Sequence, residues 1–134
     1  MSAYDVVVLG AGPGGYVAAL RAAQLGATVC LIEKDVGGGT CLNRGCIPSK
    51  ALIHGAKTFY KLKNEYAQIG ITAKDAAVDV AKLVAWKDGI VKKLTSGVGG
   101  LLKSNGVEIQ PGSARFRDAH SISVTSDGKE EQQI

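Results

Sequence analysis

Short apolar runs flank a helical pattern at the start of the chain. The runs from Tyr4 to Leu9 and from Thr28 to Ile32 are almost continuously apolar and rich in β-branched residues. Such runs are typical of strands that are buried on both faces of a parallel sheet. Between them, the stretch from Tyr16 to Leu25 is rich in alanine and is followed by Gly26, a favoured residue at a helix C-terminus. The pattern therefore predicts a strand, a helix and a second strand.

Longer helices and then short strands are predicted for the rest of the chain. One helix is predicted from Ser49 to about Tyr60, and an amphipathic one from Asp79 to about Ser104, in which Trp86 is expected to pack. Short strands are predicted at 107–110, 113–116 and 121–124, with a hairpin turn at 125–128 and a returning strand from 130. Because this β-meander stops within its last strand, we expect the chain to be part of something longer.

Three glycines follow the first predicted strand at the spacing of a dinucleotide-binding turn. Gly10 allows a tight turn, Gly12 allows the backbone to approach a pyrophosphate, and Gly15 allows the helix to pack closely on the strand. The helix N-terminus would then receive the phosphates. Glu33 stands at the end of the second strand, where a carboxylate is suited to accept hydrogen bonds from a ribose of NAD or FAD. The alternative is a turn without a ligand and a surface glutamate.

Cys41 and Cys46 lie in a run that begins with glycines and ends on Lys50. Five positions along an ideal helix turn by about 140° and rise by about 7.5 Å, whereas cysteines that form a disulfide need Cα atoms within about 7 Å. A disulfide between the two cysteines therefore requires a distorted first turn of the helix. Gly45 supplies the backbone freedom for this distortion, and Pro48 is compatible with the first turn of a helix. We expect a redox dithiol at a helix N-terminus, where the helix dipole lowers the thiol pKa.

The cysteines have two alternative interpretations. A zinc site would need further ligands, for which His54 and His120 are the only histidines, and no second cysteine pair follows. The two thiols could instead be unrelated and buried. Cys30 lies in an apolar strand and is expected to pack as a small hydrophobic residue. Lys50 is either solvated or placed to stabilise negative charge on a flavin.

The composition is that of a globular domain. The 134 residues are 46% hydrophobic and 21% charged, and the net charge of +4 is carried by scattered lysines. This pattern favours a solvated helical surface over a nucleic-acid footprint. No apolar run approaches about eighteen residues, so no membrane span is expected. The start of the chain lacks the features of a secretory signal, and the sequence predicts a cytoplasmic protein.

The joint pattern of these motifs resembles the flavoprotein pyridine nucleotide-disulfide oxidoreductases, and within them the dihydrolipoamide dehydrogenases. The resemblance covers the whole chain and implies an α/β fold: a Rossmann-like, FAD-binding βαβ unit with a parallel sheet, long helices and a C-terminal β-meander, incomplete at the C-terminus. It is carried by the fingerprint Gly10-x-Gly12-x-x-Gly15-Tyr16, by Glu33, and by the run Gly38-Gly39-Thr40-Cys41-Leu42-Asn43-Arg44-Gly45-Cys46-Ile47-Pro48-Ser49-Lys50-Ala51-Leu52.

The resemblance also implies a cofactor and roles for the site residues. FAD would be bound, with NAD as the co-substrate of the complete enzyme and no metal. Cys41 would attack the substrate disulfide, and Cys46, nearer the flavin, would exchange electrons with it. The implied FAD-binding residues are Gly10, Gly12, Pro13, Gly14, Gly15, Glu33, Lys34, Thr40, Lys50 and Ala114.

Two residues and the length depart from the family pattern. Arg44 replaces a commonly apolar residue, and Gly37 stands where leucine often precedes the Gly-Gly-Thr run. Residues 1–134 would form only the N-terminal portion of the FAD-binding domain, without the NAD-binding and dimerisation domains, and are expected to be inactive alone. The complete homodimer would act on dihydrolipoamide or on the lipoyl domain of a 2-oxoacid dehydrogenase or glycine cleavage complex. The alternatives are a non-catalytic flavin-binding or thiol-redox module completed by a partner chain, and a related reductase with another substrate, such as another small disulfide or a mercuric ion.

Overall fold

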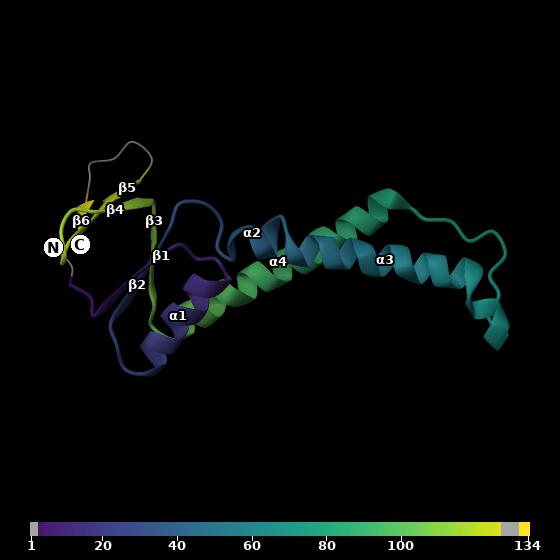
Figure 1. Cartoon of the computed structure of the whole chain (residues 1–134), viewed down its shortest axis with the longest axis horizontal. Helices are drawn as coiled ribbons and strands as arrows, with labels where there is room; N and C mark the ends of the chain where they lie inside the picture. The colour runs from purple at the N-terminus through teal and green to yellow at the C-terminus, as the bar shows by residue number, and fades with distance from the viewer. Residues whose placement is uncertain (1–2, 127–131) are drawn as a thin grey trace.

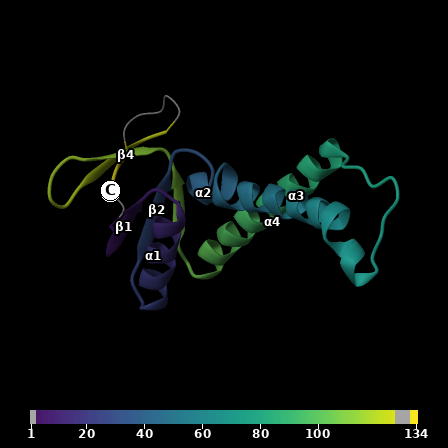
Figure 2. The ribbon, with the colours of Figure 1, turned by 45° about the vertical axis from the view of Figure 1, so that its right-hand side comes forward.

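The computed structural model describes residues 3–126 and 132–134 of the chain. Three layers lie at one end of the molecule: helices α1 (Pro13–Gln24) and α4 (Val80–Ser104), a parallel sheet and an antiparallel sheet. Two long antiparallel helices, α3 (Cys46–Asn64) and α4, extend from these layers as an arm (Figure 1). The arm projects in the same way when the molecule is turned (Figure 2). This arrangement confirms the α/β fold class predicted from the sequence.

The parallel sheet is built around β2 (Val29–Glu33), which lies between β1 (Val6–Leu9) and β3 (Glu108–Pro111). The first four residues of β2 are buried. They are buried because alternate side chains of a strand point to opposite faces, so that Leu31 enters the core under the helices and Cys30 enters the core under the second sheet. The continuous apolar run of β2 thus has a partner on each face, as predicted.

The strand β1 is less buried than its apolar run predicts. Val6 and Leu9 are 37% and 40% exposed. Among the described strands β1 pairs with β2 alone, so it forms an edge of the sheet. The helical layer contacts Val8 and the second sheet contacts Val7. The prediction of burial on both faces is therefore wrong at the ends of β1.

Two helices cover one face of the parallel sheet. Helix α1 (Pro13–Gln24) connects β1 to β2 and packs beside the C-terminal end of α4 (Val80–Ser104). It begins three residues before the predicted start because Pro13 occupies its first turn, where a proline costs no hydrogen bond. Helix α4 begins at its N-cap Asp79, whose Oδ1 accepts a hydrogen bond of 3.0 Å from the backbone N–H of Lys82.

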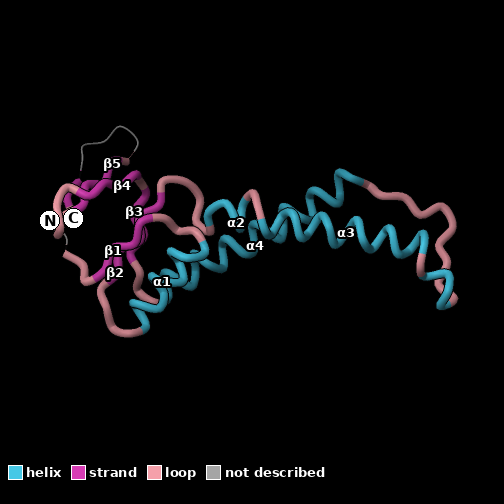
Figure 3. Tube along the Cα trace, in the orientation of Figure 1, coloured by secondary structure: helices cyan, strands magenta, loops and turns pink. Residues whose placement is uncertain are grey.

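The arm consists of α3 (Cys46–Asn64) and the N-terminal half of α4, joined through the 3₁₀ turn Tyr66–Ile69 (Figure 3). The two helices approach closely at Gly55, where an added Cβ would lie 2.5 Å from Cδ1 of Leu83. Trp86 is 47% exposed and its ring lies beside that of His54 on α3, so the predicted packing is partial.

The second sheet is antiparallel and contains β4 (Ser113–Phe116), β5 (Ile122–Thr125) and β6 (Gln132–Gln133). The chain enters it at Gly112, which has a φ of +146° and whose added Cβ would lie 2.8 Å from the carbonyl oxygen of Thr125. This switch between sheets confirms the predicted end of the third strand and the β-meander. The predicted hairpin turn includes residues 127–128, which lie outside the described part of the chain.

Candidate functional site

The glycine turn between β1 and α1 is a close backbone contact. An added Cβ at Gly15 would lie 1.8 Å from the carbonyl oxygen of Gly10, so no other residue fits there without movement of the backbone. Gly10 has a φ of +95°, which favours glycine. Its N–H donates to the carbonyl of Ile32 at 2.8 Å, which fixes the turn at the end of the sheet. Gly10 and Gly15 therefore have the structural roles predicted for them.

The N-terminus of α1 is open to a ligand. Its N-cap is Gly12, no side chain among the described residues caps it, and its first turn carries no acidic residue. An added Cβ at Gly12 or Gly14 would meet no described atom within 4 Å. The first backbone N–H groups of a helix have no partners within the helix and can bind an anion. Pro13 has no N–H, so its neighbours in the first turn would supply these groups.

The carboxylate of Glu33 is hydrogen-bonded to this turn. Its Oε2 accepts a hydrogen bond of 2.7 Å from the N–H of Ala11, and its Oε1 accepts one of 2.8 Å from the N–H of Asp35. Glu33 also lines a cleft of about 340 Å³ together with Gly10, Lys34 and others. The structure thus brings four of the predicted cofactor-binding residues to one cleft: Gly10, Glu33, Lys34 and Ala114.

The loop after β2 returns to the glycine turn before the first cysteine. Gly38 donates its N–H to the carbonyl of Ala11 at 2.8 Å. Gly39 approaches so closely that an added Cβ would lie 2.8 Å from Cα of Gly12. Gly38 and Gly39 have φ values of +93° and +58°, which favour glycine. The backbone that carries the dithiol is therefore packed directly against the predicted phosphate-binding turn.

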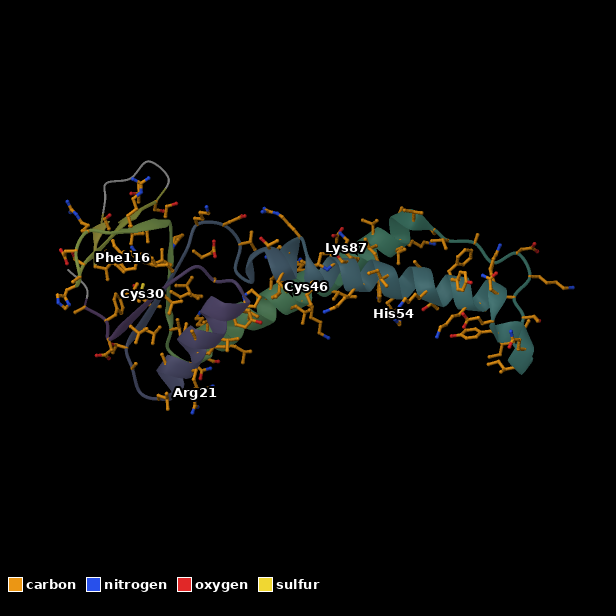
Figure 4. All side chains as sticks on the ribbon, viewed as in Figure 1. Arg21, Cys30, Cys46, His54, Lys87 and Phe116 are labelled. Atoms are coloured by element: carbon orange, nitrogen blue, oxygen red, sulfur yellow. The ribbon has the colours of Figure 1, made fainter. Side chains whose placement is uncertain are left out.

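The two cysteines lie on either side of a break between helices. Cys41 belongs to the short helix α2 (Gly39–Asn43), and Cys46 is the first residue of α3. Gly45 separates the helices with φ −122° and ψ −107°, and an added Cβ there would lie 3.1 Å from the carbonyl oxygen of Thr40. The sequence predicts a distorted helical turn at this point, and the structure has one. Cys46 lies where the helical arm meets the layers (Figure 4).

Both thiols are free and interact with each other. The hydrogen bond to the Cys46 side chain raises the pKa of Cys41 above its ordinary value, and partial desolvation and the charge of Cys46 act in the same direction. The backbone N–H of Cys46 and the ammonium of Lys50 oppose this rise. The prediction of a lowered thiol pKa is therefore wrong for Cys41, because a neighbouring sulfur outweighs both the local N–H and the local cation.

A second cleft connects the predicted ribose site with the dithiol helix. It has a volume of about 280 Å³ and is lined by Glu33, Lys34, Thr40, Arg44 and others. Arg44 forms an exposed ion pair with Asp35, with 3.0 Å between Nη2 and Oδ2. Both residues line the cleft, and their pairing was not predicted from the sequence, because it depends on how the loop folds back.

The remaining candidate residues lie away from this site. His54 is exposed on α3 (Figure 4). Its ring centroid lies 6.2 Å from that of Trp86. Cys30 is fully buried between β2 and the second sheet, as predicted, and burial raises its pKa. Within residues 3–126 and 132–134, no three His, Cys, Asp or Glu side chains are grouped as for a metal ion. None of the described helices has the length and apolar character required to cross a membrane.

Comparisons with known proteins agree with this geometry. A family model described as pyridine nucleotide-disulphide oxidoreductase matches residues 4–133. The chain is 52% identical over 127 residues to the dihydrolipoyl dehydrogenase of Thermus scotoductus, covering 95% of this chain and 27% of that protein. It is 48% identical over 132 residues to the dihydrolipoyl dehydrogenase of Pseudomonas aeruginosa, covering 97% of this chain and 28% of that protein. The chain thus spans about a quarter of the length of these relatives.

A solved structure has the same fold. It is the copper(II) complex of the HOCl-induced flavoprotein disulfide reductase RclA from Escherichia coli, which matches with a TM-score of 0.79 and 27% identity. The match covers 99% of this chain and 26% of that one. On the family match, which spans residues 4–133, this chain belongs to the pyridine nucleotide-disulphide oxidoreductases.

Proposed function

We propose that this chain is the FAD-binding and dithiol portion of a dihydrolipoyl dehydrogenase. The observation that carries the proposal is the contact of Gly39, two residues before Cys41, with Gly12 of the glycine turn. A dinucleotide held at the turn would have the dithiol directly beside it. Residues 1–134 would accordingly form the N-terminal portion of the FAD-binding domain.

The residues present fit an extended dinucleotide. The uncapped N-terminus of α1 suits its phosphates. The carboxylate of Glu33 makes two hydrogen bonds and has about four acceptor sites, so it retains capacity for a ribose. The cleft beside Ala114 has a volume of about 340 Å³, within the range of small-molecule sites. When bound, FAD would supply two-electron transfer between the thiols and NAD.

The chemistry proposed for the cysteines is thiol–disulfide exchange. One thiolate of dihydrolipoamide attacks Sγ of Cys41 in the oxidised pair, the Cys41–Cys46 bond breaks, and Cys46 leaves as a thiolate. The second substrate thiolate then attacks the substrate sulfur of the mixed disulfide and releases Cys41. The substrate loses two electrons and two protons, the cysteine pair gains two electrons, and the protons pass to the sulfurs or to water. The N–H of Cys46 and the ammonium of Lys50 stabilise the thiolate of Cys41.

The relatives of this chain support a proposal for the substrate and partners of the complete enzyme. Two relatives are dihydrolipoyl dehydrogenases, at 52% and 48% identity. We therefore infer dihydrolipoamide, free or on the lipoyl domain of a 2-oxoacid dehydrogenase or glycine cleavage complex, as substrate of a homodimer. Because the chain spans about a quarter of those proteins, we expect little NAD-linked oxidation of dihydrolipoamide by the 134 residues alone.

Visible absorption during a dithionite titration tests the proposal. The purified chain, incubated with FAD and desalted, should retain flavin bands and develop a long-wavelength shoulder on two-electron reduction. Cys46→Ser should lose the shoulder and keep the flavin, whereas Cys30→Ala, a buried residue outside the site, should keep both. Failure to retain flavin would overturn the cofactor assignment, and a shoulder that persists in Cys46→Ser would overturn the role of Cys46.

A further inference from the structure

Asn43 is the last residue of α2 and lies two positions after Cys41. Its Nδ2 donates to the carbonyl of Gly37 at 3.1 Å and to the carbonyl of Gly39 at 2.9 Å. An amide group carries two N–H hydrogens, so one is available for the loop that precedes the dithiol helix and one for the first residue of that helix. Asn43 thus connects the end of the cysteine helix to the start of that helix and to the loop before it.

The loop that Asn43 contacts loses much conformational entropy when it becomes ordered. Gly38 and Gly39 both have positive φ, and glycine loses more conformational freedom on folding than any other residue. This loop also contacts the glycine turn, through the bond from Gly38 to Ala11 and the packing of Gly39 on Gly12. The two bonds of Asn43 therefore link the dithiol helix to a loop that is itself attached to the predicted phosphate site.

Helix α2 cannot hold Cys41 in place by itself. It has five residues, and helices this short are unstable without tertiary support. Its support comes from the buried side chain of Leu42, from the amide of Asn43 and from the exposed ion pair of Arg44 with Asp35. An exposed ion pair contributes little to stability, so the placement of Cys41 opposite Cys46 across the break depends mainly on Leu42 and Asn43.

We propose that Asn43 is a positioning residue for the Cys41–Cys46 pair, and that its two hydrogen bonds favour closure of the disulfide. The proposal rests on the redox role proposed above for the two cysteines. Asn43 does not exchange electrons or protons with the substrate. It holds α2 on the loop, so the two sulfurs can form a bond without further ordering of the backbone. A pair that is already in place avoids the conformational-entropy cost of that ordering.

The closure equilibrium of the flavin-free chain in glutathione buffers tests this proposal. In this reaction the two thiols lose two protons and two electrons, the S–S bond forms, and one oxidised glutathione becomes two reduced glutathione molecules. Alkylation of the remaining thiols, followed by mass spectrometry, counts the closed fraction. The Cys41–Cys46 disulfide cannot form in Cys46→Ala, so comparison with this variant identifies the signal of this pair.

The variant Asn43→Asp keeps the side-chain shape but replaces the donor by a carboxylate that faces two carbonyl oxygens. We expect its closure constant to fall at least tenfold, or about 30 mV for a two-electron couple. The matched control is Asn64→Asp at the end of α3. Asn64 also donates Nδ2 to the carbonyl four residues before it, Tyr60, at 2.8 Å, but makes no bond to a second loop within the part of the chain that the structure describes. The closure constant of this control should change less than twofold.

A second variant keeps the test decisive if Asn43→Asp fails to fold, as judged by far-ultraviolet circular dichroism. In Asn43→Ser the hydroxyl can retain the bond to the carbonyl four residues earlier, as Thr58 does with His54 at 2.9 Å, and loses the bond to Gly37. We expect an intermediate fall of about threefold. An unchanged closure constant in the folded Asn43 variants overturns the positioning role. A wild-type chain that forms no Cys41–Cys46 disulfide would instead overturn the redox function proposed for the pair.

Discussion

The carboxylate of Glu33 accepts a hydrogen bond of 2.7 Å from the backbone N–H of Ala11. This bond joins the end of β2 to the turn that follows β1, and a second bond of 2.8 Å joins the same carboxylate to Asp35. Glu33 is therefore part of the frame of the turn before any ligand arrives. Its proposed role at a ribose adds to this structural role and does not replace it.

Replacement of Glu33 by glutamine tests the structural role. Glutamine has one acceptor oxygen in place of two, so one of the N–H groups of Ala11 and Asp35 loses its partner. We expect the free energy of unfolding to fall by about 1 to 2 kcal/mol, measured by urea denaturation without flavin. Glu65→Gln, on an exposed glutamate at the end of α3, is the control and should change stability by less than about 0.5 kcal/mol. Equal stability of wild type and Glu33→Gln would contradict this role.

Alanine substitutions at two neighbouring glycines test the close contact in the turn. In Gly15→Ala the new Cβ would lie 1.8 Å from the carbonyl oxygen of Gly10, so the helix must move away from the strand. We expect the free energy of unfolding to fall by about 3 kcal/mol or more, measured by thermal or urea denaturation. Gly14→Ala is the matched control, because a Cβ there meets no described atom within 4 Å. It should be neutral or stabilise by up to about 1 kcal/mol. Similar losses in both variants would show that the contact is not specific.

The parts of this site that the sequence predicts are those that depend on local backbone requirements. Gly15 could be identified because a helix that packs on a strand at a fixed spacing leaves no room for a side chain. The break between Cys41 and Cys46 could be predicted because an ideal helix separates residues five apart. In both cases the constraint involves residues close together along the chain, so the local sequence is sufficient to express it.

The parts that the sequence does not predict depend on tertiary contacts. The apolar run of β1 does not show that β1 pairs with only one described strand and leaves Leu9 exposed. The two acceptors of Asn43 lie four and six residues before it, and the second depends on how the loop turns back. The pKa of Cys41 was predicted from a helix dipole, but the hydrogen bond to the Cys46 side chain has the largest effect on it. Each of these features is decided by which atoms become neighbours after folding.

The charge of Lys50 should affect the reactivity of Cys41. The ammonium lowers the pKa of the thiol, so Lys50→Met removes a stabilising charge from the thiolate. We expect alkylation of Cys41 by iodoacetamide at pH 8 to slow by roughly twofold to threefold, since an exposed charge is screened by water and salt. Lys50→Arg keeps the positive charge and should react at nearly the wild-type rate. If Lys50→Met and Lys50→Arg slow the reaction equally, packing of the side chain and not its charge is responsible.

The hydrogen bond between the two thiols predicts how Cys41 titrates when Cys46 is removed. Because the Cys46 side chain is the main cause of the raised pKa of Cys41, Cys46→Ala should lower this pKa, and the alkylation rate of Cys41 should reach its half-maximum at a lower pH.

The raised pKa of Cys41 also predicts how the stability of the reduced chain depends on pH. A pKa that is raised on folding stabilises the reduced chain below the unfolded pKa, and this contribution is lost as pH rises through the folded pKa. The ordinary value is 9.0, so reduced wild type should lose stability above about pH 9 more steeply than Cys46→Ala. Thermal melts from pH 7 to 10, with Cys30→Ala as background for both proteins, measure this difference. Parallel pH profiles would show that the two sulfurs do not interact in solution.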